Sequence, residues 1–374
     1  MFLTNRQQQV RIGHTLSAKE WVRSGVPQGS VLGPLLFLIM LVDIDADIKH
    51  SMLGSYADDT RLWKFIHRIE DQELLQQDLQ VLYDWADYNN KKYNDDKFEH
   101  LPHGPENSRI YVTQSGSQIK KKNTVKDLGV YMSHDCSFNF HIANTVKTAF
   151  KVSAWILRTF LTRDKFLMKI LLQSLVVSQV EYASVVWSPF DSHNINMLEN
   201  VQRRFTSKIF EYQTWDDELQ KYICEVDYVD RLKDLKIYSL DRRRERFMIL
   251  YAYRVIIGLI QFQWFEAYED HEEQGIKLRP KYNKKAPQYI RRARHSSFFY
   301  KGPQLYNLMP AELRQFEEIV EPDQSHVDEF KKKLDKYLEM IPDEPTVPDR
   351  QRAAATNSLI CQIPMFRKQH PEAS

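Results

Sequence analysis

Tyr56-Ala57-Asp58-Asp59 places two adjacent carboxylates between two short segments that have the composition of β-strands. Residues 52–56 precede the pair, and residues 60–65, which include Trp63 and Phe65, follow it. This pattern predicts a β-hairpin with both carboxylates at its tip. Neighbouring carboxylates repel each other, and a hard divalent cation such as Mg²⁺ is a common reason for keeping them together. The pair alone does not establish a metal site, because Asp-Asp also occurs in solvated turns.

Length and composition indicate a soluble globular protein with two or three domains. The 374 residues are 43% hydrophobic and 27% charged. The formal net charge is only +2, so any affinity for nucleic acid has to come from local basic patches. Cys136, Cys224 and Cys361 are far apart and odd in number. They argue against a disulfide framework and against a zinc module, and they favour a reducing intracellular compartment, nucleus or cytoplasm.

The apolar segments are too short or too interrupted to predict a membrane span. Residues 31–42 form a run of about twelve residues, which is well below the length that a bilayer requires. This run predicts a buried helix. Residues 167–180 contain Lys169, Gln173 and Ser174, and they too predict a packed helix. We therefore expect no membrane partner.

A second motif lies upstream of the hairpin, at residues 25–37 (Gly-Val-Pro-Gln-Gly-Ser-Val-Leu-Gly-Pro-Leu-Leu-Phe). Its glycines and Pro27 favour a tight turn that a ligand can approach closely. Ser30 is suited to the N-cap of a helix that we expect to extend to about Ile48. Taken alone, the motif could be simple punctuation before a buried helix.

The two motifs, in this order and some twenty residues apart, closely resemble the reverse transcriptases of non-LTR (LINE-type, jockey-like) retrotransposons. The resemblance implies an α+β fold, with a partial right-hand polymerase palm followed by a mostly α-helical thumb and C-terminal region. It implies an RNA-directed DNA polymerase that uses Mg²⁺, an RNA template, a DNA primer and dNTPs. Asp58 and Asp59 would be the catalytic metal ligands, and Pro27, Gln28 and Gly29 would position the nucleotide and the template.

Further downstream segments extend the resemblance. Residues 71–88 have the apolar stripe of an amphipathic helix and match the helix after the palm hairpin. Lys97 would lie on a short strand near the nucleotide phosphates, although an ordinary solvated lysine is nearly as good an interpretation. Leu128 and Gly129 would belong to a turn that grips the primer, with a plain β-turn as the alternative.

The resemblance divides the chain into four parts: residues 1–135 (partial palm), 136–215 (helical, thumb-like), 216–340 (helical and basic) and 341–374 (a disordered tail). Helical spacing is clear at residues 146–160, at 165–180 after a possible N-cap at Asp164, and at 195–212. The expected nucleic-acid contacts in these parts are basic: Arg203, Arg204, Lys284, Lys285, Arg291 and Arg292. The last four lie in the stretch 277–295, which could equally be a solvated linker.

One expected component of the metal site has no counterpart here. The family carries a further catalytic aspartate on a strand upstream of the turn at residue 25, and the first 24 residues contain a single acid, Glu20. We therefore expect a truncated enzyme without fingers, with an incomplete metal site, an exposed sheet edge, poor solubility and weak or no activity. A non-catalytic RNA- or DNA-binding remnant is the alternative. An unrelated helical protein would require both motif matches to be accidental.

Overall fold

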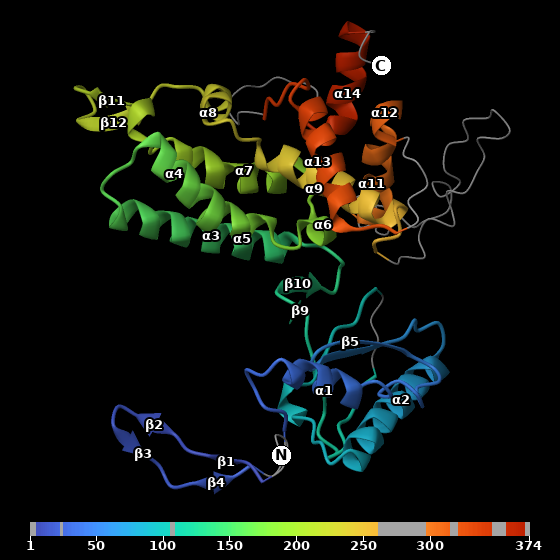
Figure 1. Cartoon of the computed structure of the whole chain (residues 1–374). Helices are drawn as coiled ribbons and strands as arrows, with labels where there is room; N and C mark the ends of the chain where they lie inside the picture. Colours follow the sequence, from blue (N-terminus) through green and yellow to red (C-terminus); the bar gives the residue numbers. More distant parts are fainter. Residues whose placement is uncertain are drawn as a thin grey trace, which may run out of the picture. The chain divides into compact units, whose positions relative to one another are not determined.

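The computed structural model describes residues 5–22, 25–104, 109–260, 297–314, 321–345 and 357–370. The chain forms two compact units, residues 1–123 and 124–374, which are considered separately below (Figure 1). Helices combine with small two-stranded sheets, which agrees with the expected α+β class. Within the described ranges, no helix is both long and apolar enough to cross a bilayer.

The first unit begins with an exposed ribbon. Its short antiparallel pairs are β1 (Gln7–Gln8) with β4 (Glu20–Trp21) and, beyond them, β2 (Arg11–Ile12) with β3 (Thr15–Leu16). Helix α1 (Leu32–Met40) follows. Each of these four strands is only two residues long.

Helix α1 differs from its prediction in length and in burial. The helix ends at Met40 rather than near Ile48, and residues 41–47 form successive turns. Contacts from another helix hold this segment: Trp85 Nε1 donates to Asp43 at 3.0 Å, and Ile44 is buried. The prediction of a buried helix is also wrong, because the most apolar side chains of α1 remain about half exposed (Leu32, Leu35, Leu38 and Ile39).

The small core of the first unit lies along α2 (Ile69–Tyr88). The predicted stripe is confirmed, with Leu79, Leu82 and Ala86 buried together with Tyr83. The Tyr83 ring contacts those of Tyr93 and Phe98. The remaining elements are β5 (Met52–Tyr56), β6 (Asp59–Trp63), the 3₁₀ turn η1 (Asp95–Lys97) and the parallel pair β7 (Glu99–His100) with β8 (Lys120–Lys121).

The second unit begins with a β-hairpin, β9 (Thr124–Asp127) and β10 (Val130–Ser133). The sequence division placed these residues with the palm at 1–135. In the structure the hairpin packs on α3 (Asn139–Thr159), where Val130 joins the core and the Tyr131 amide donates to His141 Nδ1 at 3.3 Å. The two compact units therefore divide before this hairpin.

One hydrophobic core joins α3 to α7 (Ser192–Thr206) and to the helices between them. These are α4 (Lys165–Leu171), the π-helix η2 (Leu172–Val177), α5 (Ser178–Glu181) and α6 (Ser184–Trp187). The predicted N-cap is confirmed, since Asp164 accepts from the Leu167 amide at 3.0 Å. The π-helix interrupts the expected helix at 165–180. Helix α7 ends before the 3₁₀ turn η3 (Phe210–Tyr212), although its predicted stripe is buried (Leu198, Val201, Phe205 and Ile209).

The second core surrounds α9 (Leu240–Ile256), which lies among α11 (Phe298–Asn307), α13 (Gln324–Leu338) and α14 (Leu359–Gln369) (Figure 1). The described residues of this unit also form the hairpin β11 (Gln213–Asp216) with β12 (Lys221–Cys224), α8 (Tyr228–Leu235) and the short α12 (Ala311–Arg314). Helix α14 lies in the tail from residue 341, which the sequence predicts to be disordered apart from short pieces. It forms because Leu359 and Ile363 are fully buried and because Glu245 accepts from the Leu359 amide.

Buried charges join the two cores of this unit. Glu199 accepts from the Leu240 amide at 3.0 Å and from the Tyr228 hydroxyl. Arg242 donates to the backbone carbonyl of Pro342 at 2.7 Å. Glu245 lies 3.1 Å from Lys301 Nζ. All these side chains are buried, so the basic run 242–246 forms internal contacts and is not simply a solvated face.

Candidate functional site

The carboxylate pair lies on a tight hairpin, as the sequence predicts. Strands β5 and β6 are antiparallel, and Tyr56 pairs with Asp59 across the turn. Ala57 and Asp58 are the two turn residues, and Ala57 has a φ of +53°, in the left-handed region. Asp59 is the first residue of β6, so the two carboxylates leave the backbone from the turn and from the adjoining strand.

Close packing within the hairpin explains the glycine in β5. A Cβ atom on Gly54 would lie 3.1 Å from the Trp63 ring on the opposite strand. The Ser55 and Thr60 hydroxyls, which flank the turn, lie 3.3 Å apart across the strands. The hairpin therefore has its own side-chain contacts that set the register of the two aspartates.

Asp58 and Asp59 are exposed, and their side chains form no hydrogen bond or ion pair with any described residue. Free carboxylate oxygens are suitable ligands for a hard cation such as Mg²⁺. Across the described parts of the chain, however, no group of three or more histidine, cysteine or acidic side chains could hold a metal ion. The donor chemistry thus fits a divalent cation, but two carboxylates are fewer than a two-metal centre uses.

The turn at residues 25–30 is fastened to the start of α1. Ser30 Oγ donates to the Pro27 carbonyl at 2.7 Å and accepts from the Gly33 amide at 3.0 Å. A Cβ atom on Gly33 would lie 2.7 Å from that carbonyl, so glycine is required there. Ser30 satisfies a free amide of the helix as expected, although the N-cap position itself is Val31. Gln28 and Gly29 remain exposed on this turn.

Lys97 is exposed at the end of η1 and does not lie on the strand that the sequence predicted. The strand forms two residues later, because η1 is held by its own contacts. Asp95 accepts from Ser115 Oγ at 2.6 Å and from Tyr83 Oη at 2.9 Å, and these bonds lower the pKa of Asp95. No hydrogen bond joins Lys97 or Gln28 to either hairpin aspartate in the described structure.

The turn between β9 and β10 consists of Leu128 and Gly129, with φ of +43° and +84°. Tyr182 lies against it. Its hydroxyl donates to the Leu128 carbonyl at 2.9 Å, and a Cβ atom on Gly129 would lie 3.0 Å from its ring. The sequence identified this turn, but it did not identify Tyr182 as its neighbour. The sequence shows only a tyrosine in a segment between two helices. It does not indicate that this tyrosine contacts a turn 54 residues away.

The basic residues expected to bind nucleic acid differ in their surroundings. Arg204 on α7 is exposed, with its guanidinium 5.3 Å from the centre of the Phe150 ring. Arg203 is half-buried, lies 4.9 Å above the Tyr228 ring and donates to Asn200 at 2.8 Å. Lys284, Lys285, Arg291 and Arg292 lie outside the described residues. Arg204 is therefore the more accessible of the two arginines on α7.

Comparisons with known proteins agree with the two motifs. Residues 4–132 match the family described as reverse transcriptase (RNA-dependent DNA polymerase). The RNA-directed DNA polymerase of the mobile element jockey from Drosophila melanogaster is 28% identical over 159 residues, 40% of this chain and 17% of that protein. Its counterpart from Drosophila funebris is 26% identical over 223 residues, 56% of this chain and 24% of that protein. A probable RNA-directed DNA polymerase from transposon BS of Drosophila melanogaster is 40% identical over 68 residues, 16% of this chain and 8% of that protein.

The chain thus spans about a quarter or less of the length of these curated relatives. No solved structure matches it significantly. The family match includes both the turn at residues 25–30 and the hairpin with Asp58 and Asp59. Sequence similarity therefore identifies the chain as a relative of the jockey-like reverse transcriptases of non-LTR elements.

Proposed function

We propose that this relative of the jockey-like reverse transcriptases carries part of the nucleotide-addition site of an RNA-directed DNA polymerase. The proposal depends on the hairpin turn, which lies inside the segment that matches the family. The turn leaves Asp58 and Asp59 exposed, without a side-chain partner among the described residues. In this proposal the two carboxylates hold Mg²⁺. When bound, the metal stabilises the attacking 3′-oxygen and the leaving pyrophosphate.

The other expected residues bind and orient the substrates. Pro27, Gln28 and Gly29 form the exposed turn against which the nucleotide and template would lie, and Lys97 would approach the phosphates of a dNTP. Leu128, Gly129 and Arg204 would contact the primer strand and its RNA template. An ammonium or guanidinium group suits this role because it neutralises phosphate charge.

The number of carboxylates limits the proposal for the isolated chain. A two-metal centre requires carboxylates from at least two places in the fold. The hairpin pair supplies only one such place, and among the described residues it belongs to no group of three or more side chains that could hold a metal ion. We therefore expect this polypeptide alone to extend a primer very weakly or not at all. The same observation favours a second candidate function, a protein that binds RNA or DNA without catalysis.

Primer extension on an RNA template with Mg²⁺ separates these candidates. We expect little or no extension by the chain itself, together with salt-sensitive binding of the template–primer duplex. A clear signal that Asp58→Asn removes would support catalysis and contradict the expected inactivity. A chain that neither extends the primer nor binds the duplex at low salt would overturn both candidates.

A chimera tests the hairpin within a longer polymerase. Residues 4–132 would replace the matching segment of the jockey polymerase, and extension by the chimera would be measured. We expect Asp58→Asn or Asp59→Asn to reduce the rate by about a hundredfold or more, because each would remove a metal ligand worth several kcal/mol. Asp47→Asn, which changes another exposed acid of the same unit, is the matched control and should leave the rate unchanged. Equal activity of the Asp58 and control variants would rule out the proposed metal ligands.

A further inference from the structure

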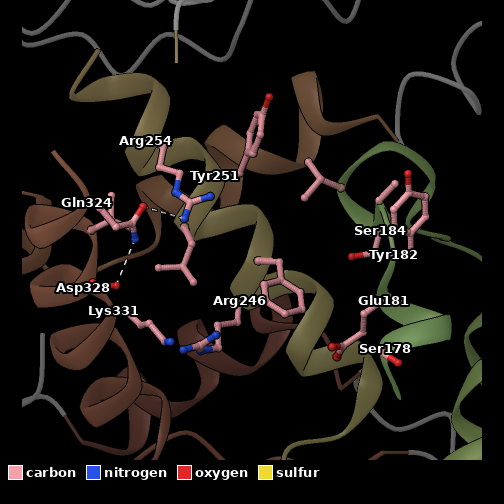
Figure 2. Close-up of a pocket in the computed structure, with 15 residues that line it drawn as sticks. Ser178, Glu181, Tyr182, Ser184, Arg246, Tyr251, Arg254, Gln324, Asp328 and Lys331 are labelled. Atoms are coloured by element: carbon pink, nitrogen blue, oxygen red, sulfur yellow. Dashed lines mark hydrogen bonds between the residues drawn. The ribbon is translucent and has the colours of Figure 1, made fainter. Parts of the chain in front are cut away.

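The second unit contains a groove that the sequence did not indicate. It has a volume of about 490 Å³, is open to solvent, and lies between α9, α13 and the segment that joins α5 to α6 (Figure 2). Its walls combine cations from two helices (Arg246, Arg254 and Lys331) with the aromatic rings of Tyr182, Phe247 and Tyr251. Cations beside aromatic faces suit a ligand that has both negative charge and flat rings.

Ion pairing leaves two of these cations available. Arg246 is engaged by Asp335, with 2.7 Å between Nη2 and Oδ2, and the acid Glu181 is engaged by Arg243. Among the described residues, Arg254 makes only a long hydrogen bond of 3.4 Å, to the neutral side chain of Gln324. Its Nε is buried and has no hydrogen-bond partner among the described groups. Lys331 is exposed and makes no ion pair with any described residue.

The two available cations lie on different helices that line the groove. Arg254 comes from α9 and Lys331 from α13, and Figure 2 shows the Lys331 ammonium directed toward the guanidinium of Arg246. Asp335 already compensates the charge of Arg246, so Lys331 is the cation of these two that remains available to a ligand. Asp328 is the remaining acid in the lining, and it accepts from Gln324 at 3.2 Å.

The wall opposite these cations has an unusual backbone. The π-helix at Leu172–Val177 ends where α5 begins, at Ser178, which lines the groove. Ala183 has a φ of +52°, a strained value for a residue other than glycine. Between them, Tyr182 is 57% exposed while its hydroxyl holds the Leu128 carbonyl. Tyr182 thus borders both the groove and the Leu128–Gly129 turn.

We propose that this groove binds a single strand of nucleic acid, with phosphates on Arg254 and Lys331 and a base on the exposed ring of Tyr182. The proposal rests on the proposed function, because it takes the Leu128–Gly129 turn as a primer contact and continues the same strand past Tyr182. Stacking on an aromatic ring is tolerant of sequence. We therefore expect the groove to accept RNA and DNA strands of any sequence.

The test measures binding of the full chain to labelled single strands of about twelve nucleotides, by fluorescence anisotropy, from about 50 to about 200 mM salt. The double variant Arg254→Gln/Lys331→Gln should bind about five- to tenfold more weakly. The slope of log affinity against log salt concentration should become shallower by about 1.4, which is about 0.7 for each of the two lost phosphate contacts. The matched control is Lys332→Gln/Lys336→Gln, which removes the same charge from exposed positions of α13 outside the groove. It should retain the salt slope of the unchanged chain.

Further measurements separate the groove from general charge and from folding. Tyr182→Phe keeps the ring and should retain affinity, whereas Tyr182→Ala should lose it. Thermal unfolding has to be alike for the groove and control variants. If the chain binds nucleic acid but both double variants lose affinity equally, the groove is wrong while the proposed function stands. The proposal would also be overturned if the groove variant lost affinity for polyglutamate as much as it lost affinity for nucleic acid, because the site would then accept any acidic polymer. A chain that binds no strand at low salt would overturn both.

Discussion

Asp58 and Asp59 on the β5–β6 hairpin differ from Glu199 and Glu245 in the second unit both in burial and in hydrogen-bond partners. The hairpin pair is exposed and has no side-chain partner among the described residues. Glu245 is fully buried and accepts from Lys301, from Ser358 and from the Leu359 amide. Glu199 is 1% exposed and accepts from Tyr228 and from the Leu240 amide.

This difference separates carboxylates that hold the fold from carboxylates that remain available. A buried acid is tolerated only where donors replace its lost hydration, so its oxygens are already used. An exposed acid without a partner costs the fold little and keeps its oxygens free for an ion. Each of the substitutions below tests whether burial and partners distinguish the two kinds of acid.

The largest effect should come from Glu245→Ala. Lys301 would lose its counter-ion in a buried site, and the N-terminus of α14 would lose an acceptor. We expect the second unit to lose about 3–5 kcal/mol of stability in denaturant unfolding, and α14 to become sensitive to protease. The control is Glu329→Ala, which removes an exposed acid paired with Lys333 and should cause no measurable change. Equal stability of the two variants would contradict a structural role for Glu245.

The pH dependence of stability tests Glu199. Burial raises the pKa of Glu199 from 4.5 to about 7, although the Tyr228 hydrogen bond opposes the shift. The folded chain therefore holds this proton more tightly than the unfolded chain does. The contribution of this proton to the free energy of unfolding is fully present below pH 4.5 and is lost as the pH rises through 7. The total loss is roughly 3 kcal/mol. We expect Glu199→Gln to remove this part of the pH dependence when both proteins are unfolded from pH 4 to 8 at matched salt. If the unfolding free energies of the two proteins changed with pH in parallel, Glu199 would titrate normally.

Asp78 is a buried acid in the unit that carries the hairpin. It is 2% exposed and accepts from the Lys49 and His50 amides at 3.3 and 2.9 Å. Asp78→Ala would leave both amides without an acceptor, at a cost of about 1–3 kcal/mol. Hydrogen exchange at these two amides should accelerate, whereas Asp84→Ala, at an exposed position of α2, should leave it unchanged. Slow exchange in the Asp78 variant would mean that other contacts hold this segment.

The parts of the fold that the sequence predicted depend on local patterns. The β5–β6 hairpin follows from strand composition on either side of a turn, the Asp164 cap from its place before an apolar period, and α7 from its stripe. The parts that it missed depend on distant partners. Helix α14 requires an acceptor on Glu245, 114 residues away, and the end of α1 depends on Trp85.

The candidate site shows the same division. The two aspartates and the Leu128–Gly129 turn were found because each is a short motif, whereas Tyr182 and the groove beside it depend on how separate helices pack. The resemblance places Lys97 on a short strand at residues 97–101, whereas in the structure the strand begins at Glu99 and Lys97 ends the preceding 3₁₀ turn. Burial of Arg242 and Arg244 could not be predicted, since a run of charges has no apolar period to indicate which side chains turn inward.

Asp58→Asn should have the smallest effect on stability. The side chain has no described partner to lose, and removing one of two adjacent charges relieves repulsion. We therefore expect the unfolding curve of the variant to match that of the unchanged chain. Affinity for Mn²⁺, measured by electron paramagnetic resonance as a substitute for Mg²⁺, should fall by about tenfold or more, because affinity depends on the number of charged oxygen ligands.

Asp45→Asn is the matched control, since Asp45 is an exposed acid in the turns after α1. It should change neither stability nor Mn²⁺ affinity. A loss of stability in Asp58→Asn comparable to that of Asp78→Ala would show that the hairpin acid is structural. Unchanged Mn²⁺ affinity would show that exposure without a partner does not make a carboxylate a metal ligand here. The combination of unchanged stability and weakened metal binding distinguishes an available acid from one that the fold has already used.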